Sequence, residues 1–546
     1  MTDTTANGVA VPLNGNRHPR GYLEEKGFWS WVYTLDHKRI GVLYLCTTLL
    51  FFLVGGILAL LIRIKLMYPG QQIFSDHIYN VLFTLHGAVM IFLFIIPAIP
   101  SGLGNFFIPL LIGARDVAFP RINLMSYWVF VAGIVVILAS LVRPMDTGWT
   151  FYTPYSAKTA ADVTLLSFGI FLVGMSSILT GLNFLVTIHK LRAPGMTWSR
   201  LPLFIWGMYA TSIIQVVATP VVGITFLLLA MERLFGVGFF DPAKGGDPLL
   251  FQHFFWFYSH PVVYVMILPA MGIISEVVPT FSRKPIFGYK AIAYSSLAIA
   301  FIGFLVWGHH MFVSGMSKTA SIIFSFLTFF VAVPTSIKVF NWIATMYKGS
   351  ITFESPMLYA LTFIFLFTFG GLTGMFLGAL ATNVHLHDTY FIVAHFHYTM
   401  MSGTVMGLLA GMHYWFPKMT GRMLNEKLAR AGWLLTFVGF NATFLVQFFL
   451  GYHGMPRRWA EYPPQYQNLN ILSTAGSWIL AVGILIMFVN FVRGLYAGEP
   501  APSNPWKGLT LEWRTASPPP TENFEEIPVI TDWPYGYGKR NREGGP

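Results

Sequence analysis

"FWFYSHPVVYVMILP", residues 255–269, lies in a long apolar stretch and still carries two tyrosines, a serine and a histidine followed by a proline. An apolar run of this kind predicts a helix that spans a membrane. Polar groups are costly at membrane depth and usually serve a function there. We therefore expect Tyr258, Ser259, His260 and Tyr264 to contribute to the chemistry of the protein.

The composition of the whole chain supports a membrane protein. Of 546 residues, 55% are hydrophobic and 10% are charged, and the mean hydropathy is +0.60; soluble domains are more polar. Cys46 is the only cysteine, which excludes disulfides within the chain and metal sites built from several thiolates. The net charge of +11 favours contact with an anionic lipid bilayer and not with nucleic acid.

Twelve apolar runs predict an all-α integral membrane bundle of twelve transmembrane helices. They lie near 41–62, 81–100, 127–142, 163–189, 203–230, 252–281, 291–312, 319–342, 356–378, 389–416, 432–452 and 472–492. Lys and Arg outside the spans favour cytoplasmic N- and C-termini. The N-terminus lacks the apolar core of a cleavable signal. We expect a cytoplasmic tail at 1–40, a catalytic domain at 41–495 and a Pro-rich cytoplasmic tail at 496–546.

Six histidines fall at one depth, in the outer half of the membrane, when this topology is applied. Each of them alone could be a core histidine with a hydrogen-bonded neighbour. Six at matched depth on four spans instead favour cofactor ligands inside the bundle. They are His86, His260, His309, His310, His395 and His397.

Helix geometry limits what these histidines can bind. His395 and His397 point to nearly opposite faces of one helix, so each could hold one of two planar cofactors that flank it. His260 could join the adjacent pair 309–310 in a three-imidazole site that suits copper or zinc. Tyr264 lies one turn after His260 on the same face, beside that metal; the alternative is simple packing with its hydroxyl satisfied.

Five longer motifs carry a family resemblance. They are "HDTYFIVAHFHY" at 387–398, "WGHHMF" at 307–312, "AVPTSIKVFNWIATM" at 332–346, "GARDVAFPR" at 113–121 and "GMPRRW" at 454–459. In order and position they resemble subunit I of the heme-copper oxidases, specifically the A-type cytochrome c oxidases, over nearly the whole chain. The resemblance implies a terminal respiratory oxidase that reduces O2 to water with four electrons from cytochrome c and translocates protons.

The resemblance also implies the ligands of each metal. His86 and His397 would be the axial ligands of a low-spin heme, and His395 the proximal ligand of a high-spin heme. Two axial imidazoles leave the first heme able only to pass electrons, whereas one leaves the second open to O2. The copper called CuB would be bound by His260, His309 and His310, with Tyr264 cross-linked to His260.

Further groups would hold the periphery of these cofactors. Arg457 and Arg458 match the pair that binds heme propionates, although two loop arginines could also be solvated. Arg63 matches the arginine that hydrogen-bonds the formyl group of heme A. His387 and Asp388 resemble a Mg site between the propionates, and such ligands suit Mg or Mn.

Two proton pathways are implied from the cytoplasmic side. Lys338, Thr335 and Ser275 match the K-channel, which leads towards Tyr264. The entrance of the D-channel is matched by Asp116, Asn105 and Asn123. Taken alone, Asp116 would be interpreted as a solvated loop carboxylate.

One position departs from the common pattern of proton-pumping members. Val262 stands where they have the glutamate that ends the D-channel, and Tyr258 and Ser259 precede the histidine. Tyr258 is one turn before Val262 on the same face, so its hydroxyl could reach the place of the missing carboxylate. This substitution resembles a bacterial branch of the A-type oxidases and favours a bacterial inner membrane.

The electron donor follows from three other positions. Quinol-oxidising relatives have an Asp and a His-x-x-Gln pair where this chain has Met67, Ile78 and Val81. We therefore expect cytochrome c, with electrons delivered through a CuA site in a separate subunit II. A subunit III and small membrane subunits are further expected partners.

Two other functions are weighed against this one. Nitric oxide reductase, in the same superfamily, lacks the His-Tyr pair, so Tyr264, Lys338 and Asp116 argue against it. A non-enzymatic heme or metal transporter would show broken helices or repeated halves, and we find neither pattern in the sequence.

Overall fold

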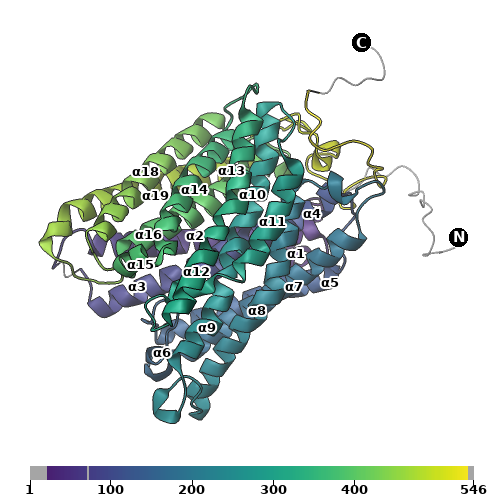
Figure 1. Cartoon of the computed structure of the whole chain (residues 1–546). Helices are drawn as coiled ribbons and strands as arrows, with labels where there is room; N and C mark the ends of the chain where they lie inside the picture. The colour runs from purple at the N-terminus through teal and green to yellow at the C-terminus, as the bar shows by residue number, and fades with distance from the viewer. Residues whose placement is uncertain (1–20, 71–72, 539–546) are drawn as a thin grey trace.

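The computed structural model describes residues 21–70 and 73–538, and these form a bundle of helices that run broadly along one direction (Figure 1). In this part of the chain no β-strand forms, and pairing is limited to isolated bridges such as Gly21 with Pro520. The all-α prediction is therefore confirmed. Residues 1–20 and 539–546 of the two predicted tails lie outside the described residues.

The helices have the following bounds. They are α1 (Phe28–Val32), α2 (His37–Lys65), α3 (Asp76–Ala88), α4 (Asn105–Ile112), α5 (Pro120–Ala139), α6 (Tyr155–Lys158), α7 (Val163–Lys190), α8 (Leu203–Phe235), α9 (Pro248–Ser259), α10 (Pro261–Ser282), α11 (Tyr289–Gly303), α12 (Lys318–Phe330), α13 (Ala332–Met346), α14 (Ser355–Gly378), α15 (Leu380–Leu386), α16 (Tyr390–Phe396), α17 (Met406–Thr420), α18 (Glu426–Tyr452) and α19 (Gln467–Ala497).

Ten of the twelve predicted spans are confirmed as helices long and apolar enough to cross a membrane. The predicted run 291–312 contains only the shorter helix α11, followed by a 3-10 turn, η6 (Trp307–Met311), which carries the histidine pair. The predicted run 389–416 is helical but consists of three segments and includes many His, Thr and Ser residues. These two runs do not qualify as spans by length and composition, so a count of twelve stays a prediction.

Local sequence explains where several helices begin and end. Asp36, Ser75 and Asn425 cap α2, α3 and α18, because each side chain accepts a hydrogen bond from a backbone N–H of the first turn. Helix α4 ends at Gly113, whose φ of 77° lies in the left-handed region that glycine adopts without strain.

Three π-helical segments interrupt the helices that carry heme-ligand candidates. η1 (Val89–Ile95) and η2 (Ala98–Gly104) join α3 to α4, and η7 (His397–Val405) joins α16 to α17. Pro97 and Pro100 lack the N–H that an α-helix would need here. Segments of this kind are frequent at functional sites.

Proline also explains the break at the opening motif. Pro261 cannot donate a backbone hydrogen bond, so α9 ends at Ser259 and α10 begins at Pro261, with His260 at the junction. The two helices continue in one run, Pro248–Ser282, and 94% of the residues in its most apolar 18-residue stretch are buried. The opening stretch is therefore the centre of the bundle.

The segment after α19 packs on the bundle. Figure 1 shows it in yellow at the end where α4 terminates. Glu512, Asn523 and Tyr535 are buried here, and the Tyr535 hydroxyl donates to Glu276 Oε1 of α10 at 2.7 Å. The described part of the predicted Pro-rich tail thus packs against the end of the bundle where α4 terminates.

Candidate metal centre

A cavity of about 1590 Å³ runs through the bundle and is lined by all six histidines that the sequence placed at one depth. The prediction that they converge is confirmed. They come from α3, the junction of α9 and α10, η6, α16 and η7.

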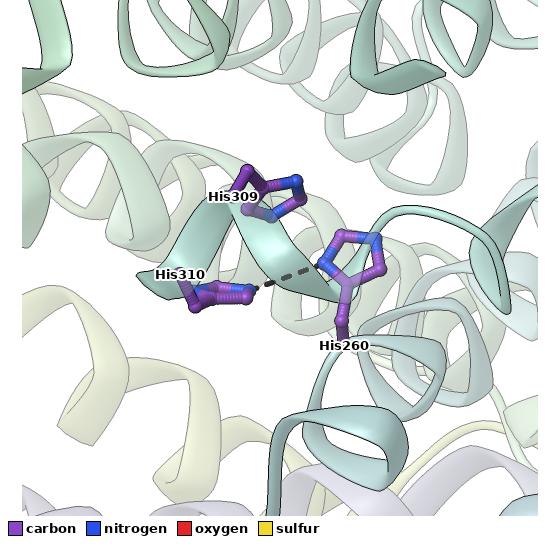
Figure 2. Close-up of side chains that lie close together, drawn as sticks. All are labelled: His260, His309 and His310. Carbon is purple, nitrogen blue, oxygen red and sulfur yellow. Dashed lines mark hydrogen bonds between the residues drawn. The ribbon is translucent and has the colours of Figure 1, made fainter. Parts of the chain in front are cut away.

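Three of these histidines form a cluster (Figure 2). One ring nitrogen from each of His260, His309 and His310 lies within 4.8 Å of the other two, the only such group found among the described residues. His260 Nδ1 lies 3.2 Å from His310 Nε2. His309 Nδ1 is hydrogen-bonded to Thr328 Oγ1 at 2.9 Å, so its Nε2 is the nitrogen left for a metal.

Tyr264 lies beside this cluster, as the one-turn spacing predicts. Its hydroxyl is 2.7 Å from His260 Nε2, so the Nδ1 of that ring remains for a metal. A Cβ at position 303 would lie 2.6 Å from the Tyr264 ring, and Gly303 therefore makes room for it. On the other side, Trp256 stacks on His310 at 3.8 Å between ring centroids and fixes that ring.

His86 and His397 face each other across the cavity. Their ring centroids are 6.5 Å apart and their planes are 10° from parallel. The Nδ1 atoms are hydrogen-bonded to the carbonyl oxygens of Gly55 at 2.9 Å and Val393 at 2.8 Å. A backbone partner of this kind orients a ligating imidazole and leaves Nε2 for the metal.

His395 points to the opposite face of its helix from His397, which confirms the geometric prediction. Its Nδ1 is 3.0 Å from the carbonyl oxygen of Gly370 in α14, whereas the His397 ring stacks on Phe444 of α18. A Cβ at position 374 would lie 2.8 Å from His395 Cε1, so Gly374 provides the space that this ring occupies.

Charged groups line one part of the same cavity. Arg457 Nε donates to Asp388 Oδ1 at 2.7 Å, and His387 Nε2 lies 3.5 Å from the other carboxylate oxygen. Burial opposes ionisation of Asp388, but Arg457 outweighs it and holds the carboxyl pKa below its usual value. Asp388 and Arg458 have φ of 55° and 68°, a strained backbone of the kind that functional sites retain.

Two guanidinium groups are left without full protein partners. Arg63 Nη2 donates to Asn470 and Thr474, but its buried Nε and Nη1 have no partner among the described residues. Arg458 packs its guanidinium against the Phe83 ring, and burial lowers its pKa to about 10. Both line the cavity, which indicates polar or anionic ligand groups there.

The predicted K-channel residues lie in α10 and α13. Lys338 is buried and donates to Ser296 Oγ of α11 at 2.7 Å. Thr335 lines the cavity, and Ser275 accepts from Trp342 Nε1 at 2.9 Å. The sequence did not identify Ser296, because a serine in an apolar helix gives no signal until its neighbour is known.

The predicted D-channel residues are Asn105 at the start of α4, Asp116 in the loop after α4, and Asn123 in the first turn of α5. Burial raises the pKa of Asp116 to about 7. The side-chain oxygen of Asn105 and both amide atoms of Asn123 are buried with no hydrogen-bond partner among the described residues. Unsatisfied polar atoms of this kind mark places for ordered water.

A chain of hydroxyl groups continues from Asn123 and was missed by the sequence reasoning. Ser126 donates to the Asn123 carbonyl at 2.7 Å, and the Tyr44 hydroxyl lies 3.0 Å from Ser126 Oγ and 2.9 Å from Ser176 Oγ. Thr180 Oγ1 lies 3.4 Å from Ser126 Oγ. Polar spacing along α2, α5 and α7 is the signal that could have indicated them.

Tyr258 and Ser259 are both buried in α9. Ser259 Oγ has no hydrogen-bond partner in the described structure. Val262 is buried with them. The relay role of Tyr258 and Ser259 stays a prediction.

A family model described as cytochrome C and quinol oxidase polypeptide I matches residues 39–479. The chain belongs to this family. It is 46% identical over 539 residues to cytochrome c oxidase subunit 1 of Thermostichus vulcanus, covering 98% of this chain and 96% of that one. It is 47% identical to the same subunit of Synechocystis sp., covering 97% and 96%.

A solved structure of a heme-copper terminal oxidase dimer has the same fold, with a TM-score of 0.75 at 20% identity. The match covers 85% of this chain and 84% of the other. Membership of the oxidase family makes this chain a multi-pass membrane protein and the catalytic subunit of a respiratory oxidase. It also implies heme and copper, and a complex with other subunits.

The residues of this oxidase subunit fit those groups. Two parallel imidazoles with their Nδ1 atoms anchored suit an iron with two axial ligands. The three-histidine cluster supplies the nitrogen ligands that copper prefers. The unpaired donors of Arg63 and the Arg458 guanidinium suit the polar substituents of a macrocycle in the same cavity.

Proposed function

We propose that this chain is the catalytic subunit of a bacterial cytochrome c oxidase that reduces O2 to water with electrons from cytochrome c and couples the reaction to proton translocation. The observation that carries the proposal is one cavity lined by a parallel imidazole pair, a separate axial imidazole and a three-histidine cluster with a tyrosine. Iron and copper, when bound, supply the electron transfer and the binding and reduction of O2.

The ring geometry supports the ligand assignment that the family resemblance implies. His86 and His397 hold the low-spin heme, and His395 holds the high-spin heme from the opposite helix face. The copper ligands are His260, His309 and His310. Tyr264, hydrogen-bonded to His260, is the residue that delivers a proton and an electron beside that copper.

The polar periphery orients heme A. Arg457 and Arg458 bind the propionates, and the unpaired donors of Arg63 bind the formyl group. His387 and Asp388 hold Mg or Mn at the same end of the cavity. The fixed charges keep these groups in place without reorganisation during turnover.

Two chains of protein groups bring protons to the cavity. Lys338 passes protons through Thr335 and Ser275 towards Tyr264. Asp116 passes protons past Asn105 and Asn123 into the hydroxyl chain of Tyr44 and Ser126. Tyr258 and Ser259 complete that route in place of the carboxyl that Val262 lacks.

The membrane arrangement supports this direction of uptake. We place the chain in the bacterial inner membrane with twelve spans and both termini cytoplasmic, in accord with the distribution of Lys and Arg. Subunit II supplies CuA, because Cys46 is the only thiol here. Subunit III and small membrane subunits complete the complex.

Purified complex tests the proposal. A pyridine hemochrome spectrum with metal analysis should give two A-type hemes and one CuB per chain beyond the copper of subunit II. O2 uptake should proceed with reduced cytochrome c and not with quinol. Excess iron without CuB would identify a nitric oxide reductase, and the absence of heme bands would contradict an oxidase altogether.

A further inference from the structure

Asn523, in the segment after α19, is completely buried and lies more than 400 residues from the loop that it contacts. Its φ is 65°, a left-handed backbone that Asn tolerates better than most residues. Two hydrogen bonds fix the turn: the Asn523 N–H donates to the Pro520 carbonyl, and the Thr515 hydroxyl donates to the Asn523 carbonyl. The side chain is thereby presented in one orientation.

The Asn523 side chain both donates and accepts hydrogen bonds. Nδ2 lies 2.8 Å from the carbonyl oxygen of Ala114 and 3.0 Å from that of Arg115, the two residues directly before Asp116. Oδ1 accepts from Lys38 Nζ at 2.8 Å. An amide can do this because it carries two N–H donors and one carbonyl acceptor, whereas a carboxylate only accepts.

A second route leads from the same side chain to Asn105. His37 Nδ1 lies 2.7 Å from the Asn105 carbonyl, which can only accept, so Nδ1 is the donor. In the neutral ring Nε2 is then the acceptor, and it lies 2.9 Å from Asn523 Nδ2 and 3.1 Å from Asn523 Oδ1. The two N–H groups of Nδ2 are thus shared among this nitrogen and the two loop carbonyls. Asn523 therefore contacts the surroundings of both residues that begin the proposed D-channel.

The charges around Asp116 come partly from the same segment. Asp36, Lys38 and Glu522 interact electrostatically with the Asp116 carboxyl. Lys38 is buried, pairs with Asp36 at 2.9 Å and donates to the Thr521 carbonyl at 2.9 Å. Movement of residues 520–524 would change both the position and the field of Asp116.

We propose that Asn523 is a positioning residue for proton uptake, because its amide fixes the loop carbonyls before Asp116 and the His37 ring on Asn105. The proposal deepens the proposed function and rests on the role of Asp116 there. It gives the segment after α19 a part in the reaction.

The test uses the purified complex and two changes at one site. Asn523→Gly accepts the φ of 65° and removes the amide, and Asn523→Asp keeps the size but cannot donate to the two carbonyls. Asn504→Gly is the matched control, since Asn504 lies in the same segment and its side-chain amide bonds to Gly508 and not to the loop before Asp116. Asp116→Asn provides the reference for a blocked pathway.

Proton uptake after oxidation of the reduced enzyme is followed with a pH indicator dye. Both Asn523 variants should slow uptake by up to about a hundredfold, the effect that a misplaced group can have, with wild-type heme and copper. Amide exchange at 114–118 should become faster, and Asn504→Gly should change neither. Asp116→Asn with Asn523→Gly should be no slower than Asp116→Asn alone, because the two residues act in one pathway.

The contrary outcomes are separable. Wild-type uptake in both Asn523 variants beside slow uptake in Asp116→Asn would overturn the positioning role and leave the D-channel proposal standing. Wild-type uptake in Asp116→Asn would overturn the D-channel proposal, and the role of Asn523 with it. Additive effects in the double variant, or slow uptake in proportion to lost heme or copper, would show that Asn523 does not act through Asp116.

Discussion

The imidazole rings of His86 and His397 lie 6.5 Å apart, within 10° of parallel, although they belong to segments more than 300 residues apart. Each ring is held by a backbone carbonyl and not by the other ring. The pair is thus oriented by the fold itself, which is the condition for a pre-organised ligand site.

Loss of either ring should remove the low-spin heme. His86→Ala or His397→Ala leaves the heme iron with one axial ligand. Electron transfer into the enzyme should be abolished while the bundle stays folded. The optical spectrum of the purified variant measures this. His413→Ala is the control, because His413 is buried with the same Nδ1 bond to a carbonyl but lies outside this cavity. A normal low-spin spectrum in either heme-ligand variant would refute the assignment.

Copper should depend on the cluster alone. His309→Asn or His310→Asn should lose CuB and keep both hemes, because no heme-ligand candidate belongs to the three-histidine group. Metal analysis and turnover are the measurements. His253→Asn, a change beside the cluster in a histidine bonded to Trp307, should retain copper. Retained copper with full turnover in the ligand variants would exclude the CuB assignment.

The buried amine of Lys338 should be required for reduction of the high-spin site. Lys338→Met removes the donor to Ser296, and electrons entering a buried site need compensating protons. Reduction should slow by at least about a hundredfold, the lower end of what a positioned proton-transfer group contributes. Stopped-flow reduction kinetics measure it, and unchanged kinetics with unchanged turnover would contradict a K-channel.

Asp116 should set a pH dependence near neutrality. Burial raises its pKa to about 7, so the carboxyl is protonated below pH 7 and loses its proton as the pH rises through that value. The uptake rate that depends on Asp116 should therefore fall above pH 7. Folding stability should fall as the pH rises from the ordinary pKa of 3.8 to about 7, because over that range the unfolded chain has already lost the proton that the folded protein keeps, and should level off above pH 7. Asp116→Asn should be slow at every pH and lack this inflection; a wild-type profile in the variant would contradict the role.

Tyr258 should carry protons by exchange of hydrogen bonds. Tyr258→Phe keeps the ring and its packing, so hemes and copper should remain while O2 reduction and proton uptake slow by about a hundredfold. Turnover and pumping in liposomes measure the effect. Wild-type rates would instead assign the relay to water or to Ser259, whose buried hydroxyl has no hydrogen-bond partner among the described residues.

A second change at the same place tests the substitution itself. Val262→Glu in the Tyr258→Phe background restores a carboxyl one turn away on the same helix face. Recovery of uptake would show that the tyrosine stands in for the missing acid. If uptake did not recover while the cofactors were intact, a carboxyl at position 262 would not replace the Tyr258 hydroxyl.

Much of the site could be predicted from the sequence because its signals are local. The spacing of His395 and His397 predicts opposite helix faces, and that of His260 and Tyr264 predicts neighbours; the structure confirms both. Ten spans are confirmed for the same reason, since apolar length is a property of a single segment.

What the sequence did not predict depends on contacts between distant segments. Ser296 meets Lys338 across 42 positions, and Asn523 meets His37 across 486. The π-helical turn that begins at His397 also escapes periodicity, because its apolar pattern does not differ visibly from that of an α-helix. Short polar residues in such places acquire meaning only from their partners.

The bond between Asn523 and His37 also bears on the order of biosynthesis. His37 opens the first long helix, whereas residues 520–524 are translated after every helix of the bundle. Until the ribosome has passed that point, the loop before Asp116 lacks its amide partner, however completely the membrane part has been inserted. In a nascent subunit the six histidines of the cavity are therefore all synthesised before the residue that holds the carbonyls next to Asp116.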